Sequence, residues 1–257
     1  MMINFKFIDR QELYDSLEIN KDIKVKKINY GDLSYLWIEN FLKTPEKAIE
    51  LLSKYPAIDG GVYTPGARQN LTPMDLVPVL QAYKTIMATV GKEIDPTHFI
   101  TSSNIVWKDV KVWKNSWVPH TDFDLVCNLW LCNYEGGTAI YKYKGFLNSK
   151  DITPNREDLE DLMPKFEMWE EGSKWYAREP SCTSHHSMSA KTKRELIKMT
   201  LVPWQNFEGD ENWELYYIIP SKYNTVAIYD GTNFHGTYAN FNEEYRYSLI
   251  SFYQPDR

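Results

Sequence analysis

The chain has 257 residues, of which 43% are hydrophobic, and a net charge of −6, so it can bury one large core. The acidic balance argues against a nucleic-acid partner held through phosphate contacts, and no apolar run is long enough to span a bilayer. The opening MMINFKFIDRQEL lacks the charged-then-apolar order of a secretory signal, and the three cysteines form no C-x-x-C pair. We therefore expect a cytoplasmic protein with reduced thiols.

The N-terminal third predicts strands and two helices. SYLWIENFL (34–42) is rich in aromatic and β-branched residues and reads as a strand. A helix follows in TPEKAIELLSKYP, with Thr44 as N-cap and Pro45 at the first helical position. A second helix is expected over 72–91, between a Thr-Pro start and a glycine stop, and Pro78 is expected to kink it.

From His98 onward the hydrophobic pattern changes to period two, which predicts a sheet. HFITSSNIVW, DFDLVCNLWLCN and TAIYKYKG alternate in this way, and LIKMTLVP, NWELYYIIP, NTVAIYDG and YRYSLISFYQ resume the pattern nearer the C-terminus. Between these two groups, NREDLEDLMPKFEMWEEG reads as an acidic helix and PSCTSHHSMSAKTKREL as a polar loop whose two histidines are solvated.

We predict a single domain. Residues 1–97 supply N-terminal strands and helices packed on the core, and residues 98–143 and 201–257 form the core itself. Residues 144–200 are an insertion between the two halves of the core, and their polarity and position suggest a lid over its mouth.

The stretch VPHTDFDLV places His120 and Asp122 one residue apart at the start of an alternating segment. On a strand, positions i and i+2 share a face, so both side chains can converge on one point. A second histidine, His235, follows an apolar strand at 225–229 and a tight DGTN turn. Two histidines and one carboxylate form the facial triad that leaves open positions on Fe(II).

Arg246 lies eleven residues after His235, and Ser248 follows two residues later. If YANFN makes a turn, both side chains lie on one face of the neighbouring strand. An arginine fork pairs bidentately with a carboxylate and a serine hydroxyl adds a donor, so the pair suits the distal carboxylate of a dicarboxylic acid.

The order His120-x-Asp122, His235, Arg246-x-Ser248 resembles the signature of the Fe(II)/2-oxoglutarate-dependent dioxygenases, particularly the prolyl 4-hydroxylase-like branch. The Gly-Gly turn in NLWLCNYEGGTAIY supports the resemblance, which covers roughly residues 98–143 and 214–254. WIENFL followed by TPEKA also resembles small uncharacterised oxygenase-like families, some of them in phages.

The resemblance implies a mainly β fold with flanking helices, a double-stranded β-helix of the jelly-roll, cupin-like kind. It implies that His120, Asp122 and His235 bind Fe(II), and that Arg246 and Ser248 hold the cosubstrate 2-oxoglutarate. Dioxygen would be consumed with release of succinate and carbon dioxide, and the carboxylate of Asp122 favours hydroxylation over halogenation. An aromatic or amide side chain usually helps to hold the cosubstrate in this family. The candidates for that contact are Trp113, Asn128, Trp130 and Tyr141.

Two other functions fit parts of the pattern. A cupin-like binding or isomerising protein would keep the barrel and a metal but has no use for Arg246 and Ser248. A zinc hydrolase could activate water with the same three ligands. For the oxygenase, the expected substrate is a peptide side chain or a small molecule.

Overall fold

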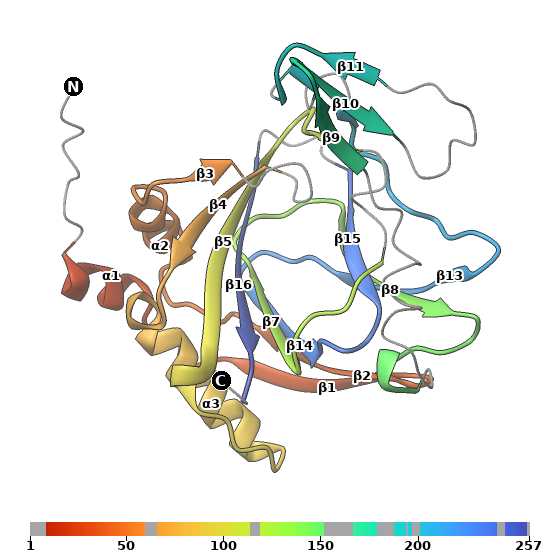
Figure 1. The fold of residues 1–257 in the computed structure, drawn as a ribbon. Coiled ribbons are helices and arrows are strands. Elements are labelled where there is room, and N and C mark those ends of the chain that lie inside the picture. The colour runs from red at the N-terminus through yellow and green to blue at the C-terminus, as the bar shows by residue number, and fades with distance from the viewer. Residues whose placement is uncertain are drawn as a thin grey trace.

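The computed structural model describes residues 9–59, 66–113, 119–151, 167–178, 188–193, 195–196, 201–240 and 245–255. Its body is an antiparallel sheet of eight strands and a smaller antiparallel sheet of three (Figure 1). In sheet order, the larger sheet contains β1 (Lys24–Tyr30), β2 (Leu33–Glu39), β14 (Thr225–Asp230), β7 (Leu125–Trp130), β16 (Tyr245–Tyr253), β5 (Phe99–Trp107), β4 (Ala67–Leu71) and β3 (Ile58–Asp59). The smaller sheet contains β13 (Trp213–Pro220), β8 (Gly136–Tyr143) and β15 (His235–Ala239).

The two sheets pack face to face around a shared core. Val126 and Trp130 from the larger sheet belong to the same buried cluster as Ile140 and Ile219 from the smaller sheet. We call the side of the larger sheet that carries this cluster its inner face. Two antiparallel sheets closed on each other in this way form the jelly roll that was predicted, and the fold class is confirmed.

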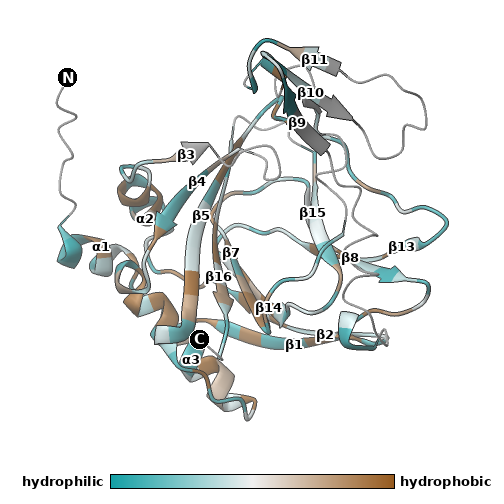
Figure 2. Cartoon of the chain, viewed as in Figure 1, coloured by the Kyte–Doolittle hydropathy of each residue, from teal (hydrophilic) through white to brown (hydrophobic). Residues whose placement is uncertain are grey.

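Helices cover the other side of the larger sheet, which we call its outer face. They are α1 (Arg10–Ser16), α2 (Pro45–Leu52) and α3 (Val77–Thr89), with short 3₁₀ turns η1 (Pro73–Asp75), η2 (Pro96–His98) and η3 (Ser149–Asp151) elsewhere in the chain. Leu51 and Tyr83 on the helices join a buried cluster with Ile38, Leu129 and Leu249 on the strands. Figure 2 shows hydrophobic residues on α2, α3 and the strands of the larger sheet.

The N-terminal third follows the sequence pattern with one correction. The expected strand and both helices are present as β2, α2 and α3, with Thr44 and Pro45 at the start of α2. Pro78, expected as a kink, lies in the first turn of α3, where its missing N–H costs nothing because that donor has no partner within the helix. Strands β1 to β4 also extend the larger sheet at both edges, so this region is part of the sheet as well as its cover.

The insertion is described only in part. Residues 152–166 and 179–187, with His185 and His186, lie outside the described residues. The described part includes a separate three-stranded antiparallel sheet, drawn at the top of Figure 1. Its strands are β9 (Glu167–Glu171), β10 (Lys174–Arg178) and β11 (Met188–Ala190).

The helix expected through EMWEE is therefore wrong at its C-terminal end, because Gly172 adopts a positive φ of 65° and turns β9 back onto β10 as a hairpin. The lid stays a prediction. Among the described residues, no helix has both the length and the apolar character needed to cross a membrane.

Candidate metal centre and cosubstrate pocket

His120 and His235 lie opposite each other on adjacent backbone segments. They exchange both backbone hydrogen bonds, at 2.9 and 2.8 Å, as an isolated antiparallel bridge. His120 and Asp122 were expected on one strand, but β7 begins only at Leu125. The N–H of Asp122 instead donates to the carbonyl oxygen of Gly231 at 2.8 Å. The segment before β7 therefore lies along the turn that precedes His235, and this contact places the carboxylate.

The turn between β14 and β15 has a sequence suited to that contact. The carboxylate of Asp230 accepts hydrogen bonds from the backbone N–H and the hydroxyl of Thr232, at 2.9 and 2.6 Å. A Cβ at Gly231 would collide with the carbonyl oxygen of Phe123. Only glycine allows the two backbones to approach this closely, so Gly231 is a condition for the position of Asp122.

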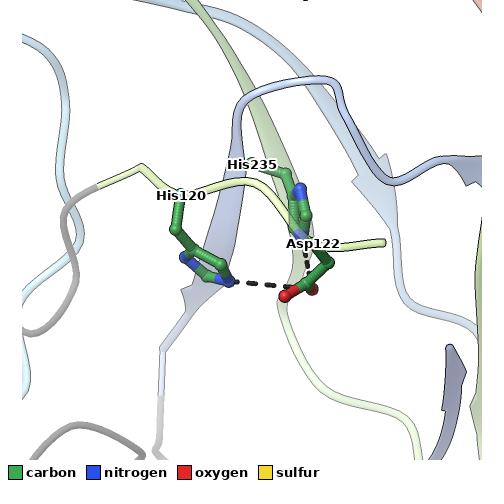
Figure 3. Close-up of side chains that lie close together, drawn as sticks. All are labelled: His120, Asp122 and His235. Atoms are coloured by element: carbon green, nitrogen blue, oxygen red, sulfur yellow. Dashed lines mark hydrogen bonds and ion pairs between the residues drawn. The ribbon is translucent and has the colours of Figure 1, made fainter. Parts of the chain in front are cut away.

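The three side chains predicted as metal ligands do come together (Figure 3). Their ligand atoms lie within 4.8 Å of one another. The Asp122 Oδ2 atom is 3.0 Å from His235 Nε2 and 3.9 Å from His120 Nε2. Transition metals bind such ligands at about 2.0–2.2 Å, so atoms at these separations can share one ion.

His235 is the most firmly oriented of the three. Its Nδ1 donates to the carbonyl oxygen of Asn233 at 2.8 Å, which leaves Nε2 directed at Asp122. The ring of Tyr229 packs edge-on against it, with centroids 5.3 Å apart. The His235 side chain is 5% exposed, whereas that of His120 is 43% exposed, so the cluster opens to solvent on the side of His120.

The charges around Asp122 favour its ionised form. Burial by itself raises the pKa of Asp122, but the hydrogen bond from His235 and the charges of His235, His120 and Arg68 outweigh it and hold the pKa below its ordinary value. An ionised carboxylate is what a metal ion requires as a ligand.

The second predicted pair, Arg246 and Ser248, lies on the inner face of β16. Ser248 is directly opposite Trp130, which belongs to the core between the sheets. Arg246 is 4% exposed, and its guanidinium carbon lies 4.4 Å from the ring centroid of Tyr134. The strand that carries Arg246 was expected to lie next to the strand of His235. Instead, β16 belongs to the larger sheet and β15 to the smaller sheet. The chain crosses between the sheets at this point, as a jelly roll requires.

Many buried polar atoms on the inner face lack a hydrogen-bond partner in the described part of the chain. They are Arg68 Nε, Ser102 Oγ, Asn104 Oδ1, Asn128 Oδ1, Arg246 Nε and Ser248 Oγ. A buried donor or acceptor without a partner costs about 1–3 kcal/mol, so such a concentration is expected where a polar ligand completes the structure. Tyr229 lies on the same inner face and packs against His235, so it connects these residues to the metal cluster. Burial and the charge of Asp122 raise the pKa of its hydroxyl, whereas the charge of Arg246 lowers it.

The other candidates for the cosubstrate contact lie in different places. Asn128 and Trp130 are on the inner face, and the amide nitrogen of Asn128 lies 3.5 Å from the Thr138 hydroxyl. Tyr141 is on the opposite side of β8, where it packs in another cluster and donates its hydroxyl to the Phe207 carbonyl oxygen at 2.8 Å. The side chain of Trp113 lies outside the described part of the structure.

The sequence pattern does not single out two residues of the inner face. Tyr134 lies in NYEGG, which predicts only a turn, and its place over Arg246 depends on how that turn folds back. Arg68 lies in β4, and ARQNL has too few β-branched or aromatic residues to predict a strand. Its pairing with β5 is what turns its side chain inward.

No protein-family model matches the chain, and no curated protein matches it. Among solved structures, the chain is similar to HygX from Streptomyces hygroscopicus, a structure with nickel and 2-oxoglutarate bound. The TM-score is 0.42 and the sequence identity 11%, over 97% of this chain and 89% of HygX.

Proposed function

We propose that this chain is an Fe(II)- and 2-oxoglutarate-dependent oxygenase that hydroxylates a small molecule or a peptide side chain. The observation that carries the proposal is the pairing of two features between the sheets. One is the cluster of two histidines and one carboxylate, and the other is a buried arginine and serine on the inner face, each with a buried polar atom that has no hydrogen-bond partner among the described residues.

The residues fit both groups that this function requires. His120, Asp122 and His235 would hold Fe(II) on one face and leave positions for other ligands. Arg246 and Ser248 would hold the distal carboxylate of 2-oxoglutarate, because a guanidinium fork matches a carboxylate and both side chains have unused donors. Together with dioxygen, the bound metal and cosubstrate would supply the oxidising chemistry.

The protein's own contribution is to orient and to exclude water. The ring of Tyr134 covers the Arg246 guanidinium, which holds the fork in a dry environment where a charge-assisted hydrogen bond is strong. Asn128 and Trp130 add polar atoms along the same wall. Since His120 is on the exposed side of the cluster, the substrate would enter from that side.

The two other functions use less of the site. A zinc hydrolase needs the three metal ligands but gives no role to the buried Arg246, and a non-oxidative cupin-like protein gives none to the Arg246–Ser248 pair. A buried guanidinium with an unsatisfied donor is costly, so the oxygenase explains more of the structure. Membership of the prolyl 4-hydroxylase-like branch stays a prediction from the order of the motifs.

An anaerobic titration tests the proposal. The metal-free protein is loaded with Fe(II) and then titrated with 2-oxoglutarate, and the absorption band of a metal chelated by a 2-oxo acid is recorded. We expect the band to appear, and oxygen uptake with succinate formation to follow when air is admitted. Loading with Zn(II), followed by assays with ester and amide substrates, examines the hydrolase. Hydrolysis by the zinc form, with no 2-oxoglutarate band in the iron form, would contradict the oxygenase.

A further inference from the structure

Arg68 is a second inward-facing arginine between the sheets. It is paired with Asn104 on β5, and Asn104 is paired with Ser248 on β16. Residues directly opposite each other in antiparallel strands share a face, so these three side chains form a row on the inner face. Arg68 therefore lies on the wall that carries the cosubstrate pair.

The position of Arg68 in this row separates it from the cosubstrate pair. Neighbouring strands are about 4.8 Å apart, so β4 lies about 10 Å from β16. A dicarboxylic acid whose one end is held by Arg246 and whose other end is at the metal makes no use of a cation two strands away. Arg68 is thus available for another ligand.

Arg68 also interacts electrostatically with Asp122 in the metal cluster. Its charge is among those that lower the pKa of Asp122, and burial lowers the pKa of the guanidinium while Asp122 raises it. Its buried Nε has no hydrogen-bond partner among the described residues, and neither do the side-chain oxygens of Asn104 and Ser102 on β5. Ser102 lies two residues before Asn104 in β5, on the same face.

We propose that Arg68, with Ser102, binds a carboxylate of the substrate beside the metal. This inference rests on the proposed function, since it assigns the substrate class of the same site. The guanidinium fork would pair with the two carboxylate oxygens and the Ser102 hydroxyl would donate to the same group, whereas the Asn104 amide oxygen would accept from an N–H or O–H elsewhere on the substrate. The enzyme would then select acidic small molecules or peptide segments that carry a free carboxylate.

The charge balance favours a carboxylate over a phosphate ester. One guanidinium with a neutral hydroxyl partner compensates a single negative charge, and Asp122 is already close enough to interact with Arg68. A phosphate monoester carries about −1.5 to −2 at neutral pH and would be repelled more strongly by Asp122. A phosphorylated probe therefore serves as a comparison in the test.

Binding measurements on the anaerobic complex of protein, Fe(II) and 2-oxoglutarate provide the test. The probes are a set of N-acetyl-L-amino acids, the same set as primary amides, and N-acetyl-O-phosphoserine amide. Binding is read from the change in the metal absorption band and from the thermal unfolding midpoint. The proteins are the wild type, Arg68→Gln, Arg68→Lys and, as a matched control, Arg10→Gln in α1 on the outer side of the sheet.

For the wild type and Arg10→Gln, we expect at least one acid to bind about tenfold or more tightly than its amide, and the phosphorylated probe to bind no better than that amide. Arg68→Gln should lose this preference and Arg68→Lys should keep part of it, because the charge remains without the fork. Affinities for Fe(II) and 2-oxoglutarate should stay within about twofold of the wild type in all variants.

Three results would overturn the inference. Equal binding of acids and amides by the wild type would exclude carboxylate recognition. Loss of 2-oxoglutarate affinity in Arg68→Gln would assign Arg68 to the cosubstrate, and loss of iron affinity would assign it to the positioning of Asp122. Failure of the proposed function gives a different result. In that case the wild type shows no 2-oxoglutarate absorption band even before a probe is added.

Discussion

At the level of Arg68 and Gln69, neighbouring polar residues on the inner and outer faces of β4, β5 and β16 differ in their hydrogen bonding. On the outer face, the side-chain oxygen of Gln69 accepts hydrogen bonds from the hydroxyls of Ser103 and Tyr247, at 2.5 and 2.7 Å. The amide nitrogen of Gln69 donates to the Tyr55 carbonyl oxygen at 2.8 Å. On the inner face, the adjacent residues Arg68, Asn104 and Ser248 each have a buried atom without a partner among the described residues.

The difference distinguishes polar side chains that stabilise the sheet from polar side chains that we expect to bind a ligand. Both sets belong to the same sheet, and each inner residue is next in sequence to its outer neighbour. The outer network satisfies its own polar groups and so stabilises the sheet against the helices. The inner groups leave that cost uncompensated, as expected where a ligand supplies the missing partners.

The largest expected effect is the loss of metal on removal of a ligand. His120→Ala, Asp122→Ala and His235→Ala should each weaken iron binding by more than the roughly 10–100-fold that loss of an outer hydrogen-bond partner costs. Iron content after anaerobic loading measures this, with unfolding curves to show that the fold persists. His98→Ala in η2 is the matched control, and iron loss there but not in His120→Ala would show that the cluster is not the metal site.

On the outer face, Gln69→Leu should cost stability and leave ligand binding intact. The change keeps the volume but removes the acceptor of two buried hydroxyls, at about 1–3 kcal/mol for each. Denaturant unfolding gives the loss, and a titration with 2-oxoglutarate should give the wild-type affinity. A variant that loses 2-oxoglutarate binding while remaining fully stable would remove the distinction between the faces.

Arg246→Lys should weaken ligand binding and leave stability nearly unchanged, which is the reverse of Gln69→Leu. Lysine keeps the charge and loses the planar fork, so the affinity for 2-oxoglutarate should fall by about 1.5–3 kcal/mol. Iron affinity and the free energy of unfolding should change little, because Arg246 makes no hydrogen bond to another described residue through its buried Nε. Unchanged cosubstrate affinity would point to a structural arginine stacked on Tyr134.

The smallest effect is expected for Ser248→Ala. Its hydroxyl is buried and lacks a partner in the described structure, so its removal should leave the ligand-free protein as stable as before or slightly more stable. The affinity for 2-oxoglutarate should fall by about 0.5–1.5 kcal/mol, the net value of one hydrogen bond. Thermal unfolding by calorimetry measures the stability of the ligand-free protein, and a calorimetric titration measures the affinity for 2-oxoglutarate. Destabilisation of the ligand-free form would mean that the hydroxyl already has a structural partner.

The sequence by itself determined the parts of this protein that depend on local pattern. The apolar alternation from His98 onward predicts strands, and the Thr-Pro starts of α2 and η1 predict helical turns, because these signals act over a few residues. The residue types and order of His120, Asp122, His235, Arg246 and Ser248 likewise predict metal ligands and a carboxylate partner before any fold is known.

The tertiary structure alone decided how those residues meet. Asp122 is placed by the backbone of Gly231, about a hundred residues later in the chain, and β16 pairs in the sheet opposite to that of β15. Tyr134 lies in a loop and Arg68 in a strand with no distinctive pattern, yet Tyr134 contacts Arg246 and Arg68 lies on the inner face, whereas Tyr141 lies on the far side of β8. Pairing between distant strands fixes which alternate side chains face inward, and a shift of one residue would exchange the two faces, so local pattern cannot determine it.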